Sequence, residues 1–284
     1  MGWEKELEEL RHRQDLAKKM GGEEKLARHI NAGKLPVRDR INAILDENSF
    51  HEVGSITGKA DYDEQGNLTD MQPANLITGR GKVDGKTVVV AGDDFTVRGG
   101  ANDAGIREKL IHVEMMANQL QLPLIRLVDG TGGGGSVKTI ETEGRTYIPA
   151  VRGWDVVVDN LSTIPVVGLA LGSTAGLGAA RVAASHYSVM VKETSQMFVA
   201  GPPVVARVGE SLTKNELGGS DIHTRNGAVD DEVDTEAEAF EHARKFLSYL
   251  PPSVHQLPER MKADDDPARR DEWLIEAIPR NKRQ

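Results

Sequence analysis

The run Leu122-Pro123-Leu124-Ile125-Arg126-Leu127-Val128-Asp129 leads directly into Gly130-Thr131-Gly132-Gly133-Gly134-Gly135. The same design recurs about forty residues later, where Ile164-Pro165-Val166-Val167-Gly168-Leu169-Ala170-Leu171 precedes Gly172-Ser173-Thr174-Ala175-Gly176-Leu177-Gly178. Each apolar run has the length of a buried strand, and the glycines after it predict a tight turn. Backbone with so few side chains can approach a ligand closely, and amides at the start of a helix point outward. The two turns therefore predict a site that stabilises negative charge with main-chain amides.

Composition excludes several classes of function. The chain has 284 residues, a formal net charge of −9 and no cysteine. The negative charge argues against nucleic-acid binding, which needs a basic face. Without cysteine there are no disulfides, thiolate metal sites or cysteine nucleophile. The charged start of the chain predicts no secretory signal, and no apolar run approaches the roughly 20 residues of a membrane span, so we expect a cytoplasmic protein without membrane contact.

The first ninety residues contain four predicted segments. Leucines at helical spacing predict one or two amphipathic helices in residues 1–34. Pro36 predicts the start of a short helix that runs to residue 45. The polar residues 60–74 predict an exposed loop. Apolar runs on both sides of Asp84-Gly85 predict an antiparallel hairpin over residues 75–91.

The remaining segments alternate helix and strand. Helices are predicted over residues 103–120, near 145–161 and over 233–249, and a short buried strand over 187–191. Residues 253–284 are polar and charged and predict a tail or linker. The inward faces of the first and last of these helices are assigned to Ile106, Leu110, Val113 and Ala117, and to Ala237, Phe240, Ala243, Phe246 and Leu247.

The order of these segments predicts a layered α/β fold. Five separated stretches then point to one family, because they occur there in the same order. These stretches are residues 35–41, Asp93-Asp94-Phe95-Thr96-Val97 with Gly99-Gly100, residues 191–202, Glu216-Leu217-Gly218-Gly219, and His223-Thr224. Over about residues 30–252 the chain resembles the N-terminal half of the carboxyltransferase β subunit of biotin-dependent acyl-CoA carboxylases, of the propionyl-, acetyl- and methylcrotonyl-CoA carboxylase type.

The resemblance implies a crotonase-like (ClpP/crotonase) superhelix of ββα units with an N-terminal helical extension. We expect the extension over residues 1–34, the acyl-CoA carboxyltransferase domain over 35–252, and a charged tail or linker over 253–284 toward a missing C-terminal half. In the family, the matching site for biotin lies in that second half.

The resemblance also implies a function for the two turns. The subunit transfers a carboxyl group from carboxybiotin to the α, or vinylogous γ, carbon of an acyl-CoA, and backbone donors stabilise the thioester enolate. The predicted catalytic residues are Gly132, Gly133, Gly176, Leu177 and Gly178. Leu177 stands where the family usually has glycine, which keeps the N–H but adds an isobutyl group. The predicted acyl-CoA contacts are Phe95, Thr96, Gly99, Gly100, Gly130, Thr131 and Ala175.

Cofactor and partners follow from the same resemblance. We expect biotin carried by a partner protein or domain, a CoA thioester as substrate, and no metal. Biotin carboxyl carrier and biotin carboxylase subunits are the expected partners, together with further copies of the chain in a family-like hexamer. Arg98, Arg126, Lys138 and Arg181 lie near the turns and are considered for the CoA phosphates, with solvation as the alternative.

Other interpretations stay open at this stage. A biotin-linked or biotin-independent acyl-CoA (malonyl-thioester) decarboxylase subunit, or a non-catalytic acyl-CoA binding scaffold, would use the same turns. Gly130, Gly132 and Gly135 match the dinucleotide pattern G-x-G-x-x-G, but four consecutive glycines meet many patterns by chance. A phosphate-binding loop would need glycine at Val137, and the turns could also be loops without a ligand. The histidines show no metal-ligand spacing, which favours structural roles for His186 and His223.

Overall fold

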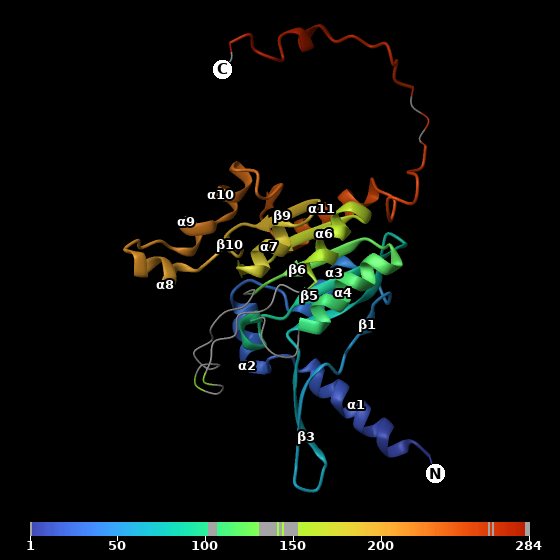
Figure 1. Cartoon of the computed structure of the whole chain (residues 1–284), viewed down its shortest axis with the longest axis vertical. Helices are drawn as coiled ribbons and strands as arrows, with labels where there is room; N and C mark the ends of the chain where they lie inside the picture. Colours follow the sequence, from blue (N-terminus) through green and yellow to red (C-terminus); the bar gives the residue numbers. More distant parts are fainter. Residues whose placement is uncertain are drawn as a thin grey trace.

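The fold is built around one seven-stranded sheet with the strand order β1-β4-β5-β6-β7-β9-β11 (Figure 1). The computed structural model describes residues 2–101, 107–130, 141, 144, 153–260, 262 and 264–281. The strands of the main sheet are β1 (His51–Val53), β4 (Leu76–Val83), β5 (Lys86–Asp93), β6 (Leu124–Val128), β7 (Val166–Ala170), β9 (Tyr187–Val191) and β11 (Asp231–Val233). Two smaller sheets pair β2 (Gly58–Tyr62) with β3 (Leu68–Pro73) and β8 (Ser173–Ala175) with β10 (Gln196–Phe198).

Helices precede, separate and follow these strands. The helices before the sheet are α1 (Glu4–Lys18), α2 (Glu23–Asn31) and α3 (Val37–Ile44). Those between strands are α4 (Arg107–Leu120), α6 (Trp154–Thr163), α7 (Leu177–Ala183), α8 (Pro202–Val205), α9 (Lys214–Gly218) and α10 (Ser220–Arg225). The chain then forms α11 (Glu236–Ser248), and single 3-10 turns occur at Arg98–Gly100, Ala206–Val208 and Glu272–Ile275.

The strands from β5 to β11 are parallel, so their carboxyl ends meet at one edge of the sheet. The two predicted Leu/Ile-Pro strands are confirmed as the neighbours β6 and β7, with Val128 opposite Ala170. Pro123 and Pro165 lie just before their strands, where the missing N–H costs no hydrogen bond between strands. Their carbonyls accept the N–H groups of Val89 and Leu124, respectively, from the neighbouring strands. The predicted hairpin over 75–91 is confirmed as the antiparallel pair β4–β5.

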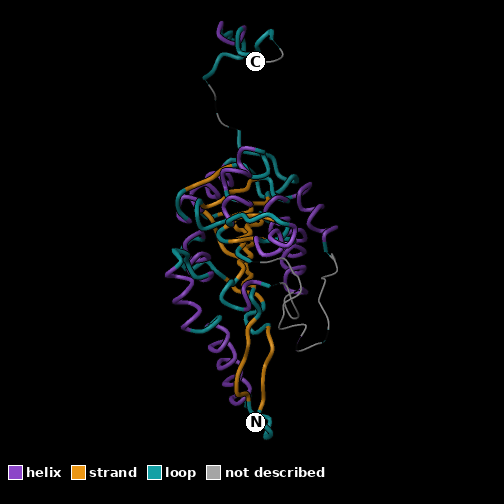
Figure 2. Tube along the Cα trace, turned by 90° about the vertical axis from the view of Figure 1, so that its left-hand side faces the viewer, coloured by secondary structure: helices purple, strands orange, loops and turns teal. Residues whose placement is uncertain are grey.

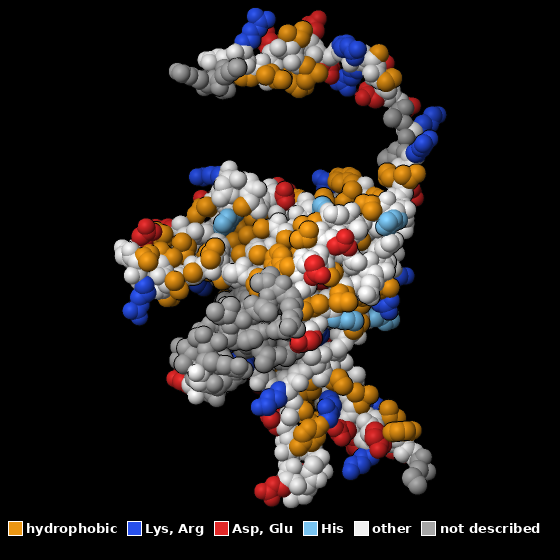
Figure 3. Space-filling view, in the orientation of Figure 1, with side chains coloured by type: hydrophobic (Ala, Val, Ile, Leu, Met, Phe, Trp, Pro, Cys, Tyr) orange, Lys and Arg blue, Asp and Glu red, His pale blue; other side chains and the backbone are white. Residues whose placement is uncertain are grey.

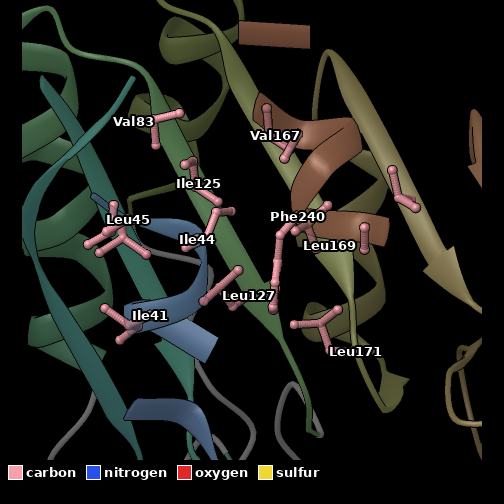
Figure 4. Packing of buried hydrophobic residues seen from close by; sticks show 14 of the residues in the cluster. Ile41, Ile44, Leu45, Val83, Ile125, Leu127, Val167, Leu169, Leu171 and Phe240 are labelled. Atoms are coloured by element: carbon pink, nitrogen blue, oxygen red, sulfur yellow. The ribbon is translucent and has the colours of Figure 1, made fainter. Parts of the chain in front are cut away.

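Each face of the sheet has its own apolar cluster. Side chains alternate along a strand, so Ile125 and Leu127 point to one face and Leu124 to the other. On the first face, α3 and α11 cover β6 and β7, with Ile44 and Phe240 inserted between them (Figure 4). Helix α4 covers the opposite face.

Two local predictions were wrong. Residues 60–74 form most of the antiparallel hairpin β2–β3, not a loop, because their turn-forming residues are confined to the tip, where the Asp63 carboxylate accepts the N–H groups of Gln65 and Asn67. In α11, Ala237 is exposed and Ala239 is buried. The other four inward residues predicted for α11 pack in or against the core. The helical positions predicted within 103–106, Ile106 among them, and within 145–152 lie outside the described residues.

An arm extends from the body of the molecule (Figures 1 and 2). It consists of α1 and the hairpin β2–β3, which pack through Leu16 and Ala17 of the helix against Met71 and Leu68 of the hairpin. At the other end of the chain, residues 257–260, 262 and 264–281 are exposed almost throughout and run away from the body.

Candidate functional site

Gly130, the described residue of the first glycine turn, lies against the second turn at the carboxyl ends of β6 and β7. The N–H of Ala175 donates to the carbonyl of Gly130 over 3.3 Å. A Cβ atom on Gly178 would lie 2.8 Å from the same carbonyl oxygen, closer than real side chains come. Gly130 therefore packs directly on the second turn and on the start of α7, and this contact requires that residue 178 has no side chain.

A third glycine-containing segment joins this contact. Gly100 follows β5 and has a φ of +68°, a conformation that favours glycine. A Cβ atom there would lie 2.7 Å from the Cα atom of Gly130. The structure thus brings together Gly100, Gly130 and Ala175, three of the predicted acyl-CoA contacts, while Gly99 has open space where its Cβ would be.

The second turn presents main-chain donors. Gly176 has φ 56° and ψ −119°, which only glycine adopts readily, and its own N–H donates to the carbonyl of Phe198 over 3.1 Å. The first helical hydrogen bond of α7 runs from the Ala180 N–H to the Gly176 carbonyl. The N–H groups of Leu177 and Gly178 precede that bond and so have no partner within the helix. The Leu177 side chain, half-buried, lies beside them.

The remaining predicted residues differ in how the structure places them. Thr96 is buried, and its hydroxyl is engaged within the protein, because it donates to Asp94 over 2.5 Å and accepts the Gly21 N–H over 3.0 Å. Phe95 keeps 36% of its surface exposed, and the Lys34 ammonium lies 4.5 Å from its ring centre. Three predicted residues lie outside the part of the chain that the structure describes: Thr131, Gly132 and Gly133.

A buried ionic network lies directly beneath the first turn. The carboxylate of Asp129 is fully buried and accepts from Lys34 over 3.0 Å and from Arg40 over 2.9 Å. The Arg40 guanidinium also binds Glu236 through two donors at 2.7 and 2.8 Å and the Leu171 carbonyl at 3.1 Å. The charges of Lys34 and Arg40 thus balance those of Asp129 and Glu236. These hydrogen bonds join α3, α11 and the ends of β6 and β7.

His29 borders this network in its neutral form. Burial lowers the pKa of His29, and the positive charge of Lys34 lowers it further. The Nε2 atom lies 3.1 Å from the Leu35 carbonyl, which fixes it as the protonated nitrogen of the neutral ring. The nearest carboxylate oxygen of Asp129 is 3.9 Å from Nε2, so Lys34 and Arg40 hold Asp129 and His29 does not.

Gly172 is the point at which the second turn touches this network. A Cβ atom on Gly172 would overlap the Asp129 carboxylate, which its cations hold in place. We expect Gly172→Ala to lower the free energy of unfolding by about 1–3 kcal/mol, as overpacking does. Urea unfolding followed by circular dichroism measures the change. The matched control is Gly201→Ala, whose Cβ atom would lie at an ordinary 3.5 Å from Phe198. Equal losses of unfolding free energy in the two variants would contradict a close contact between Gly172 and Asp129.

Comparison with known proteins assigns the chain to a family. A profile of the carboxyl transferase domain matches residues 28–284. The chain belongs to the carboxyl transferase domain family. The propionyl-CoA carboxylase carboxyltransferase subunit of Haloferax mediterranei is 33% identical over 283 residues, which are 98% of this chain and 54% of that protein. The methylmalonyl-CoA decarboxylase subunit alpha of Veillonella parvula is 28% identical, over 92% of this chain and 51% of that one.

A solved structure confirms the predicted crotonase-like fold. Transcarboxylase 12S, crystallised as a hexamer with methylmalonyl-CoA and methylmalonic acid, superposes with a TM-score of 0.76 at 25% identity. The match covers 94% of this chain and 51% of the transcarboxylase chain. The predicted resemblance to acyl-CoA carboxylase subunits is confirmed as well, and the chain spans about half the length of these relatives.

In this carboxyl transferase domain, two of the cations considered for the CoA phosphates are paired inside the protein. Arg126 is fully buried and pairs with Glu114 through two donors at 2.8 Å. Arg181 is 6% exposed and donates to Asp93 over 3.0 Å. Solvation is wrong for both arginines, because each is buried and balances the charge of a buried carboxylate. The CoA-phosphate assignment is wrong for the fully buried Arg126 and stays a prediction for Arg181. Lys138 lies outside the described residues.

The two histidines expected to be structural are so in this domain. His186 accepts the Val166 N–H at Nδ1, and the Nε2 atom of His223 lies 2.7 Å from the Met197 carbonyl. Across the described residues, no group of three or more histidine, aspartate or glutamate side chains could hold a metal ion. Nor does any described helix have the length and apolarity that crossing a membrane requires.

The ionic network of the carboxyl transferase domain did not emerge from the sequence patterns, although one signal for it was present. Arg40 shares the helical spacing of Val37, Ile41 and Ile44, and all four are buried on one face of α3. An arginine at an inward position predicts a buried carboxylate partner, but the spacing does not say which one. Neither Lys34 nor Glu236 carries a comparable local signal.

Proposed function

We propose that the chain binds an acyl-CoA and stabilises its enolate while a carboxyl group is transferred between biotin on a partner and the α, or vinylogous γ, carbon of the acyl group. The observation that carries the proposal is the packing of Gly130, where the first glycine turn begins, against the second turn at the adjacent strand end, with the Leu177 and Gly178 N–H groups free of helical partners. Donors fixed in this way need no reorganisation as negative charge develops on the thioester oxygen.

The roles of the site residues follow from this proposal. Leu177 and Gly178, next to Gly176, would donate to the thioester oxygen, with Gly132 and Gly133 of the first turn completing the set. The half-buried Leu177 side chain would narrow the acyl pocket relative to a glycine. The acyl-CoA would lie along the loop after β5 and the first turn, against the predicted contacts Phe95, Thr96, Gly99, Gly100, Gly130, Thr131 and Ala175. The domain would extend over 35–252, between the helical extension and the charged tail.

Biotin and further subunits complete the proposed activity. When bound, carboxylated biotin on a partner would supply the carboxyl group, and we assign to this chain only the acyl-CoA side. Biotin carboxyl carrier and biotin carboxylase subunits are the proposed partners, and a hexamer like that of transcarboxylase 12S is the proposed assembly. We also propose a cytoplasmic location, which the cysteine-free composition favours.

A second candidate function is decarboxylation of an acyl-CoA. The 28% identity to the methylmalonyl-CoA decarboxylase subunit alpha of Veillonella parvula favours it. The same donors would then stabilise the enolate left after loss of CO2. This alternative includes biotin-linked and biotin-independent decarboxylation, so the test separates carboxyl transfer to biotin from decarboxylation without biotin. Label exchange between a carboxylated acyl-CoA and biotin, in an assembly with the partner subunits, supports transfer to biotin, and release of CO2 without exchange supports the biotin-independent decarboxylase.

Thermal stability in the presence of CoA esters tests the acyl-CoA assignment. A ligand that binds only the folded chain raises its stability by about 2.7 kcal/mol at one hundred times its Kd, so the Tm should rise with the concentration of the matching ester. A panel from acetyl-CoA to long-chain acyl-CoA, followed by differential scanning fluorimetry, also ranks the acyl groups. Nicotinamide nucleotides are the control, and a rise in Tm with these instead of CoA esters would favour the dinucleotide interpretation.

A further inference from the structure

Helix α1 carries an exposed apolar stripe that the proposed function does not use. Trp3, at the N-cap position, and Leu7 and Leu10 expose 75%, 47% and 38% of their surfaces. Their spacing of four and then three residues places them along one side of the helix. Figure 3 shows hydrophobic side chains on this arm, near the N-terminus. An exposed stripe of large side chains at this spacing is typical of a helix that pairs with another helix.

The stripe is distinct from the surface with which α1 contacts its own hairpin. Leu16 packs against the apolar side chains of β3, and Arg13 binds Glu9 over 2.6 Å and lies against the ring of Tyr62. At 100° per residue, these three helix positions lie on a neighbouring side of α1 from the stripe. The stripe therefore remains available while the arm keeps its own packing.

The charges beside the stripe change sign along the helix. In a heptad pattern Trp3 and Leu10 occupy d positions, and Leu7 and Gln14 occupy a positions; the next d position, Ala17, is buried against the hairpin and ends the stripe. The flanking e positions then hold Glu4, Arg11 and Lys18, and the flanking g positions hold Glu6 and Arg13. The first turn of the stripe is thus flanked by acids and the later turns by bases.

We propose that α1 pairs antiparallel with α1 of a second copy of this chain. In this register Leu7 lies opposite the partner's Leu10 and Trp3 opposite the partner's Gln14. Glu4 then faces the partner's Arg11, and Glu6 faces the partner's Arg13, a base that Glu9 and the Tyr62 ring of its own arm already hold in place. Because the pair has two-fold symmetry, each attraction occurs twice.

The charges that flank the stripe favour an antiparallel over a parallel pair, and they also indicate what the partner is. A parallel pair would bring Glu6 to the partner's Arg11, but it would also set Arg13 against the partner's Lys18, a repulsion made twice. The antiparallel pair contains attractions only, and the sequence of α1 is complementary to itself, which identifies a second copy as the occupant. The arm extends away from the body, so antiparallel arms would keep the two bodies at opposite ends (Figures 1 and 2).

The contact is short, so we expect it to form reversibly with concentration. It spans only two heptads, about the length at which an isolated helix is marginal in water. The pairing does not depend on the proposed function, because the stripe shares no residue with the glycine turns. Its failure would leave the acyl-CoA assignment untouched.

Charge reversal on the full chain tests the pairing. Arg11→Glu turns two attractions into two repulsions, and we expect it to weaken self-association by about tenfold in sedimentation equilibrium. The double variant Glu4→Arg/Arg11→Glu exchanges the two charges and should restore association only in the antiparallel register. Loss without restoration, an unchanged response to Arg11→Glu, or a chain that is monomeric at every concentration would overturn the proposal.

Single cysteines test the register directly, because the chain has no cysteine of its own. Leu7→Cys and Leu10→Cys chains, one of them carrying a mass tag, are mixed and oxidised gently. The antiparallel register brings residue 7 opposite residue 10, so at equal concentrations the mixed disulfide should exceed twice the yield of either homodisulfide, which is the ratio that random pairing gives. A mixed disulfide at or below that ratio would overturn the proposal.

Discussion

Replacing Asp129 with alanine is expected to lower the free energy of unfolding by about 3–5 kcal/mol, the largest stability change that we predict for a single side chain. The Asp129 carboxylate is fully buried, and its oxygens accept from Lys34 and Arg40 at 2.9–3.1 Å. Removing it leaves the Lys34 ammonium, whose side chain is 10% exposed, without its carboxylate. Arg40 keeps Glu236 but loses one of its two anions. Equilibrium urea unfolding followed by circular dichroism measures the loss.

Two further variants make this result specific to the network. Asp15→Ala removes a carboxylate from an exposed pair with Lys18 and should cost less than about 1 kcal/mol. The double variant Asp129→Asn/Lys34→Met removes one charge of each sign. Its free energy of unfolding should fall less than that of Asp129→Ala, since the effects of substitutions within one ionic network are not additive. A cost for Asp129→Ala no larger than that for Asp15→Ala would argue against the network as a fixed support.

This network also marks the limit of what the sequence could predict. The two strands and their glycine turns were predictable, because apolar runs and glycines act over neighbouring residues. Arg40 and Glu236 are 196 residues apart, and their pairing depends on α3 and α11 packing against the same face of the sheet. No local pattern connects them, so the support beneath the first turn emerged only from the fold.

The hairpin β2–β3 shows a different limit. Its residues are mostly polar because the strands extend away from the body and bury little, so neither strand shows the clear alternation of a half-buried strand. What the sequence does contain is the turn Asp63–Asn67, held by the Asp63 carboxylate. Turn chemistry was thus visible where strand periodicity was not. The same arm exposes the stripe of α1, which helical spacing predicted as part of an amphipathic helix without indicating its partner.

Leu177→Pro is expected to reduce carboxyl exchange between a carboxylated acyl-CoA and biotin by about 100- to 1000-fold, with the fold intact. Proline removes the N–H of Leu177, and loss of one such donor costs roughly 3–4 kcal/mol of transition-state stabilisation. The fold should tolerate it, because Leu177 is the first residue of α7, where proline is accepted. Gly176 before it has a ψ of −119°, outside the α region that proline disfavours in the preceding residue.

The control for this variant is Leu177→Ala, which keeps the N–H and removes the isobutyl group. If the amide is the active part, Leu177→Ala changes the preference among acyl groups while Leu177→Pro lowers kcat for all of them. Binding of the ground-state CoA ester, measured by the shift in Tm, should change far less than kcat, because the donor acts mainly on charge that develops during reaction. Undiminished exchange by a folded Leu177→Pro chain, assembled with its partner subunits, would rule out this amide as a donor to the enolate.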